Sequence, residues 1–105
     1  INYTAEGKIR VDTVIGVGYG EDIKKTKEVL LKVLTSNDKV LTDPAPSVNV
    51  MELADSSVNF AVRPFCKPED YWDVYFATHE NCKIALDEAG IEIPYPHRVQ
   101  IQKES

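Results

Sequence analysis

The chain has 105 residues, of which 43% are hydrophobic and 28% charged, as expected of a single globular domain that buries a sizeable core. Its formal net charge of −5 argues against a nucleic-acid partner, because binding to phosphates needs an excess of Lys and Arg. No apolar run approaches the roughly 20 residues that span a bilayer, and the sequence starts at Ile1 rather than Met, so we expect a piece of a longer protein.

The first strong pattern predicts a strand from about Ile9 to Tyr19, after a short segment that we interpret as the end of a preceding module. Its odd positions from 11 to 19 are β-branched or aromatic and share one face of a strand. The even positions Gly16, Gly18 and Gly20 leave the other face nearly bare. We expect these glycines to be structural, because they permit close approach of a neighbouring strand, helix or subunit.

This glycine run differs from a dinucleotide-binding fingerprint, which needs a third glycine where Glu21 stands. Glu21 and Asp22 also put two carboxylates where a phosphate would bind, so repulsion replaces attraction. The acidic pair instead suits the start of a helix. From Ile23 to Leu34 apolar residues repeat at helical spacing, and lysines fill a solvated opposite face.

A proline-containing loop at 39–47 leads into a predicted hairpin. Its strands are Ser47–Ala54 and Ser57–Phe65, separated by a two-residue turn. Pro64 cannot donate a hydrogen bond to a neighbouring strand. The end of the second strand therefore lies at a sheet edge or at a bulge.

A long second helix is predicted to begin around Pro68 and to end at Ala89, with Gly90 just beyond its C-terminus. Its aromatic residues make an apolar surface wider than contact with one sheet needs. Two interpretations explain this surface equally well: a second packing partner, or a helix that is covered on all sides within the domain. His79 and Cys82 have the spacing of a metal pair, but two ligands do not make a site. We interpret Cys82, like Cys66, as a small buried hydrophobe.

After this helix, Ile93–Pro96 is predicted to be extended, and residues 98–102 alternate polar and apolar side chains as a short strand does. The order β-α-β-β-α-β predicts an α+β sandwich of the ferredoxin-like kind. We find no nucleophile elbow, no catalytic triad and no paired acids with a histidine. We therefore expect no enzyme, no cofactor and no metal.

Three stretches with consistent order and spacing carry a family resemblance: DTVIGVGYGEDI at 12–23, SSVNFAVRPFC at 56–66 and AGIEIPYPHRVQIQ at 89–102. Together they resemble the cytoplasmic C-terminal region of the small-conductance mechanosensitive channels, the MscS family. The resemblance covers essentially the whole chain. The most specific part is the G-I-x-I-P-Y-P stretch followed by a short strand.

The resemblance implies a homoheptameric channel of the bacterial inner membrane, which opens under tension during hypo-osmotic shock and releases ions and small solutes. This region would form a hollow vestibule on the cytoplasmic side, with portals between subunits. Residues 1–9 would end the middle β-domain, 10–92 would form the α/β vestibule domain, and 93–105 would be a proline-rich link and a barrel strand. That strand would leave its own domain and pair with its copies in an intersubunit β-barrel; it comprises Arg98, Val99, Gln100, Ile101 and Gln102.

Two other hypotheses remain at this point. One is a soluble ferredoxin-like regulatory domain that binds a small molecule or a metal, suggested by the order of elements and by His79 with Cys82. The other is a small enzyme similar to acylphosphatases. The missing phosphate-binding loop counts against that enzyme.

Overall fold

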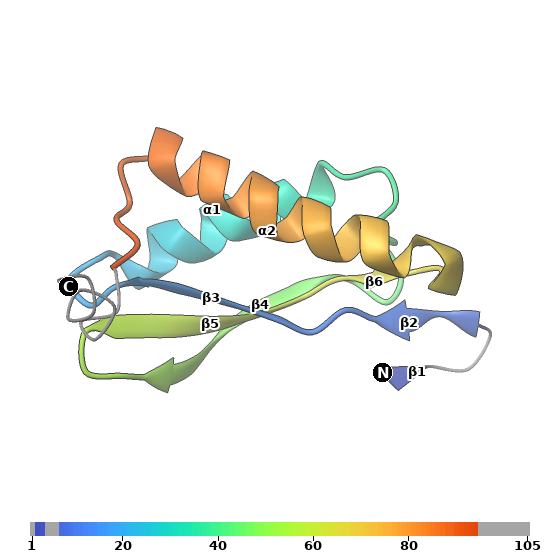
Figure 1. Cartoon of the computed structure of the whole chain (residues 1–105), viewed down its shortest axis with the longest axis horizontal. Coiled ribbons are helices and arrows are strands. Elements are labelled where there is room, and N and C mark those ends of the chain that lie inside the picture. The colour runs from blue at the N-terminus through green and yellow to red at the C-terminus, as the bar shows by residue number, and fades with distance from the viewer. Residues whose placement is uncertain (1, 4–6, 95–105) are drawn as a thin grey trace, which may run out of the picture.

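The structure, a computed structural model, describes residues 2–3 and 7–94. Two helices lie side by side on one face of a ribbon of antiparallel strands (Figure 1). Within these residues the strands form two sheets of three strands each, and a short 3-10 turn at Pro68–Asp70 precedes the second helix. The elements are β1 (Asn2–Tyr3), β2 (Ile9–Arg10), β3 (Thr13–Gly18), α1 (Ile23–Thr35), β4 (Ser47–Leu53), β5 (Ser57–Arg63), β6 (Phe65–Cys66) and α2 (Tyr71–Glu88).

The larger sheet has the order β3-β5-β4, with β5 antiparallel to both neighbours. The strands joined by α1, β3 and β4, therefore run in the same direction with β5 between them. The predicted hairpin of β4 and β5 is confirmed. An α+β domain with two helices and small antiparallel sheets is confirmed as well.

The prediction of one continuous strand from Ile9 to Tyr19 is wrong, because the segment divides into β2 and β3, which belong to different sheets. The register nevertheless continues across the division: Ile9 faces Cys66 in β6, and Thr13 faces Val62 in β5. The division has a chemical cause at Pro64.

Val11 donates its N–H to the carbonyl of Pro64 at 2.8 Å. In an antiparallel pair of this kind, the residue at position 64 would normally donate its own N–H back to the carbonyl of Val11. Pro64 has no N–H, so the returning bond is missing. The strand is interrupted at this proline, since β5 ends at Arg63 and β6 begins at Phe65. Of the two predicted settings, a sheet edge or a bulge, the structure has the edge, because β6 is the last strand in the order β1-β2-β6.

The main core lies between the large sheet and the two helices, with the fully buried Phe60 of β5 among its members. The odd residues of β3 from 13 to 17 are buried, whereas Tyr19 is exposed because the strand ends at Gly18 and the chain turns. A smaller cluster lies between the second sheet and the start of α2. The main cluster comprises Ile15, Val17, Leu30, Leu34, Val48, Val58, Phe60, Val62, Cys82, Leu86 and Ile91; the smaller one comprises Ile9, Val11, Val40, Cys66 and Val74.

Both helices have well-formed ends. The Asp22 side chain caps α1 by accepting the N–H of Lys25 at 3.0 Å, as the acidic start predicted. At the end of α2, Gly90 has a φ of +75° and donates to Asp87, while Ile91 donates to Leu86. This pair of bonds is a Schellman motif, so the prediction of Gly90 as the residue that ends this helix is confirmed.

The glycines of β3 have different surroundings. A Cβ at Gly16 would lie 2.9 Å from Oδ1 of Asn59, which faces Gly16 across the sheet. The Asn59 amide is held in place, because it accepts from Ser57 Oγ at 3.0 Å and donates to Glu52 at 3.2 Å. A Cβ at Gly20 would meet nothing within 4 Å. Gly16 is therefore the position at which a side chain would disturb the sheet.

Both cysteines are fully buried, Cys82 in the main core and Cys66 in the smaller cluster. Burial disfavours the thiolate, and it raises the pKa of Cys82 to about 12 and that of Cys66 to about 11. The interpretation of both cysteines as small buried hydrophobes is confirmed, since both side chains pack in the core. A reactive thiol needs a lowered pKa and access to solvent, and these have neither.

We expect Gly16→Ala to lower the free energy of unfolding by about 1 kcal/mol, because the new methyl displaces the Asn59 amide from its hydrogen bonds. In an Asn59→Ala background the same change should cost nothing, so a double-mutant cycle measured by urea denaturation isolates the contact. Gly20→Ala is the matched control and should be neutral. Equal losses at the two glycines, or additive effects in the cycle, would contradict this account.

The buried thiols also predict a pH dependence. The folded chain keeps Cys82 protonated, whereas the unfolded thiol ionises at about pH 8.5, so rising pH above that value favours the unfolded state. The free energy of unfolding should therefore fall between pH 8 and 10, and it should fall less in Cys82→Ala. Val74→Ala on the same helix is the control, since it loses packing but no thiol. Parallel pH curves for wild type and Cys82→Ala would refute the prediction.

Candidate functional site

The turn after β3 holds the segment that follows α2. Gly18 donates its N–H to the carbonyl of Glu92 at 2.8 Å, and Glu21 donates its N–H to the carbonyl of Gly18 at 3.0 Å. The Glu21 carboxylate then accepts the N–H of Glu92 at 3.0 Å. Lys25 on α1 adds a bond to the carbonyl of Ala89 at 3.3 Å. These contacts fix the position of residues 89–92 against the end of β3 and the start of α1.

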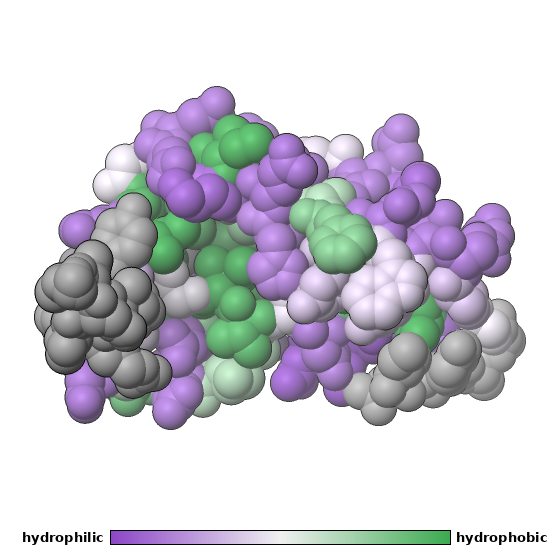
Figure 2. All heavy atoms as spheres, viewed as in Figure 1, coloured by the Kyte–Doolittle hydropathy of each residue, from purple (hydrophilic) through white to green (hydrophobic). Residues whose placement is uncertain are grey.

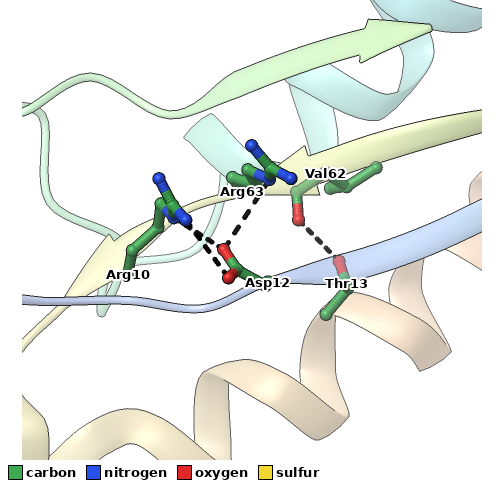
Figure 3. A network of polar contacts seen from close by, with 5 residues as sticks. All are labelled: Arg10, Asp12, Thr13, Val62 and Arg63. Atoms are coloured by element: carbon green, nitrogen blue, oxygen red, sulfur yellow. Dashed lines mark hydrogen bonds and ion pairs between the residues drawn. The ribbon is translucent and has the colours of Figure 1, made fainter. Parts of the chain in front are cut away.

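A second polar cluster joins the two sheets where Pro64 interrupts their pairing. The Asp12 carboxylate accepts from Arg10 Nε at 2.6 Å and Nη2 at 3.3 Å, and Arg63 Nε lies 3.7 Å from the same carboxylate. Figure 3 shows both guanidinium groups directed toward Asp12, beside the bond from Thr13 to the Val62 carbonyl. The hydrogen bond to Asp12 raises the pKa of Arg10. Asp12 therefore links the end of β2 to the end of β5.

The first half of α2 carries an aromatic surface, made of Tyr71, Trp72, Tyr75, Phe76 and His79. Neighbouring rings contact each other edge-to-face or stacked, with centroids 4.8 to 6.2 Å apart. Trp72 is 59% exposed and Phe76 61% exposed. In Figure 2 pale and green side chains gather over this half of α2. The described part of the chain therefore leaves this helix incompletely covered.

A groove of about 950 Å³ runs between α1 and α2. Its lining mixes apolar side chains of both helices with charges of both signs, and an ion pair between Lys39 and Asp73, 2.8 Å apart, lies in its wall. The lining includes Val33, Ile84 and Ala85 among apolar residues. Such a groove has space for a small solute, but its lining contains no nucleophile paired with a base.

The possible metal pair separates in the structure. Cys82 lies in the main core, whereas the half-buried His79 ring packs on Tyr75 and its Nδ1 lies 3.0 Å from the carbonyl of Tyr75. Among residues 2–3 and 7–94, no three His, Cys, Asp or Glu side chains come close enough to hold a metal ion. In that same part of the chain, no helix is both long and apolar enough to cross a membrane.

Of the residues predicted to matter for assembly, the structure describes the glycines. Gly16 faces Asn59, Gly18 belongs to the turn that holds Glu92, and Gly20 is exposed. The predicted barrel strand, Arg98, Val99, Gln100, Ile101 and Gln102, lies outside the described residues.

Sequence reasoning missed the roles of Asp12 and Glu21. The sequence marks Glu21 as a carboxylate that excludes phosphate and suits the start of a helix, whereas its partner Glu92 lies 71 positions away. The available signal for Asp12 is an acid next to Val11, the residue that faces Pro64, and this signal can be recognised only once the register of the strands is known. The groove has no local signal, because it depends on the spacing of two helices.

The family of the chain follows from comparison with known proteins. The family model described as "Mechanosensitive ion channel MscS, C-terminal" matches residues 11–93. An uncharacterized MscS family protein of Synechocystis is 47% identical over 98 residues, which are 93% of this chain and 33% of that protein. The small-conductance mechanosensitive channel of Edwardsiella ictaluri is 42% identical over 96 residues, 91% of this chain and 34% of the relative. The chain thus spans about a third of these relatives.

Solved structures have the same fold. The crystal structure of Helicobacter pylori MscS in its closed state superposes with a TM-score of 0.81 at 32% identity, over 90% of this chain and 38% of that one. Arabidopsis thaliana MSL1 gives a TM-score of 0.72 over 88% of this chain and 35% of that chain, and at 13% identity it supports the fold alone. The residues matched by the family model, 11–93, include Asp12 and Pro64 between the two sheets and the residues that line the groove. The chain therefore belongs to the MscS family, a family of channels rather than enzymes, and residues 11–93 correspond to its C-terminal domain.

Proposed function

We propose that this domain forms part of the wall of a vestibule on the cytoplasmic side of a mechanosensitive channel in the bacterial inner membrane. The channel releases ions and small solutes on hypo-osmotic shock. The observation that carries the proposal is the family match over residues 11–93, which includes both helices and the large sheet. Membership in a channel family is the reason to prefer it over a soluble regulatory domain that binds a metal or a small molecule.

In this proposal residues 10–92 form a vestibule domain, a ferredoxin-like βαββα sandwich, and residues 1–9 end the middle β-domain. The division between the sheets at Val11 and Asp12 supports a boundary near this point. Because β6 pairs with β2, residues 65–66 of the vestibule domain contribute a strand to the smaller sheet, to which the end of the middle β-domain also belongs. The ion pairs of Asp12 with Arg10 and Arg63 then lie within the vestibule domain, next to this boundary.

Residues 93–105 form a proline-rich link and a strand, and the strand pairs with its copies in an axial barrel of a homoheptamer. Two features support this: the alternation of polar and apolar residues from Arg98 to Gln102, and the anchoring of Glu92 at the end of β3. A short strand is weak by itself, but a closed barrel leaves no unpaired edge.

The vestibule acts on solutes through size and charge. Portals between subunits limit the size of what passes, and the net charge of −5 per chain favours cations in the enclosed water. No catalytic chemistry is needed for this role.

A downshock experiment tests the proposal. The full-length parent gene, expressed in cells that lack mechanosensitive channels, should place its product in the membrane and rescue the cells from hypo-osmotic shock. Val99→Asn/Ile101→Asn should weaken heptamer assembly on native gels, because polar side chains replace the apolar face of the barrel strand. Gln100→Asn/Gln102→Asn should not, since it changes only the polar face. A soluble full-length product that gives no rescue would defeat the proposal.

The barrel strand should become ordered only in the oligomer. In a monomeric sample of this chain, hydrogen exchange measured by NMR should find the amides of Val99 and Ile101 exchanging about as fast as in an unfolded peptide. In the assembled channel the same amides should be protected. Protection in the monomer would contradict pairing between subunits as its source.

A further inference from the structure

Among the described residues, the edge of β3 that faces away from β5 is unpaired along most of its length. Val11 donates toward the strand of Pro64, and Gly18 donates in the opposite direction to Glu92. Odd and even residues of a strand send their backbone groups to opposite sides. The N–H and C=O groups of Val14, Gly16 and Gly18 therefore point to the open edge. Within the described residues, the bond from Gly18 to Glu92 is the backbone hydrogen bond found on that edge.

The segment after α2 starts in the position of a fourth strand. Glu92 lies opposite Gly18 through their 2.8 Å bond, and the neighbouring Ile93 packs on the main core. A strand that continued antiparallel to β3 would bring residue 94 opposite Gly16 and residue 96 opposite Val14. Because the Glu92 carbonyl faces β3, the backbone N–H groups of residues 94 and 96 would have to face it too.

Both of those residues are prolines. A proline is tolerated in an edge strand when its nitrogen faces solvent, but here both nitrogens would face β3. The carbonyls of Gly16 and Val14 would each lose a donor. Hydration is the better alternative for these carbonyls, since Val14 is 50% exposed.

The first pair of this would-be strand is also incomplete. In a full antiparallel pair, Glu92 would return its N–H to the carbonyl of Gly18. Instead Glu92 donates to the Glu21 carboxylate at 3.0 Å, and the Gly18 carbonyl accepts the N–H of Glu21 at 3.0 Å. Glu21 thus occupies both partners of the missing bond.

We propose that Glu21, Pro94 and Pro96 form a strand stop, which prevents the C-terminal segment from completing the sheet of its own domain along β3. The strand stop keeps residues 98–102 available for pairing with other copies of the chain; this destination rests on the proposed function. An unblocked segment would pair with β3 of its own subunit, because an intramolecular partner is always at hand. The prolines therefore select pairing between subunits by excluding pairing within one.

The test removes the prolines from this chain of 105 residues. In wild type, the amides of Val14 and Gly16 should exchange rapidly with solvent deuterium. In Pro94→Val/Pro96→Val they should exchange about tenfold more slowly, because a fourth strand now covers the edge. Pro46→Val, in the loop before β4, is the matched control and should leave both amides as in wild type. The amide of Phe60 in the central strand reports whether each variant is folded.

Two outcomes overturn the strand stop: slow exchange of Val14 and Gly16 in the wild type, or unchanged exchange in a folded double variant. If the double variant does not fold, Pro94→Val alone decides, since it removes the first block after Glu92 and should slow the exchange of Gly16, the residue opposite position 94.

The same double variant in the full-length channel separates this inference from the proposed function. A protected β3 edge together with reduced heptamer on native gels supports both. Protection of the edge with normal assembly supports the strand stop and refutes the barrel as the destination of the segment. Reduced assembly without protection refutes the strand stop and leaves the barrel in place.

Discussion

Backbone hydrogen bonding between residues 9–18 and 57–66 is the constraint on which the rest of the domain depends. One register runs through both sheets, from the pair of Ile9 with Cys66 to that of Gly18 with Ser57. It places the buried face of β3 and the central Phe60 toward the helices. It also decides, through the direction of each N–H, where a proline is tolerated and where it ends a sheet. Pro64 ends one sheet for this reason.

The elements were predictable where the signal is local. Alternation in β3, the acidic start of α1 and Gly90 after α2 each follow from a side chain acting on its own backbone. Pro64 was predicted to interrupt a strand, but the division of the predicted strand Ile9–Tyr19 needed the partner strand as well. A proline interrupts its neighbour's hydrogen bonds as much as its own.

The candidate site was less predictable because its contacts join residues far apart in sequence. The contact of Glu21 with Glu92 and that of Asp12 with Arg63 exist only after the strands have paired and α2 has packed. The groove depends on how α1 and α2 lie against each other, which no local pattern encodes. The glycines show the reverse case: the sequence marks three bare positions, and only the neighbours distinguish the tight Gly16 from the open Gly20.

The aromatic surface has a consequence for observation rather than for folding. The chain contains one tryptophan, Trp72, and that side chain is 59% exposed among other rings on α2. Its fluorescence therefore comes from a single place, and the emission maximum depends on how much water surrounds the indole. Any protein surface, lipid or solute that covers the start of α2 will shift that emission toward shorter wavelength. The domain thus carries an intrinsic optical reporter of its own surroundings.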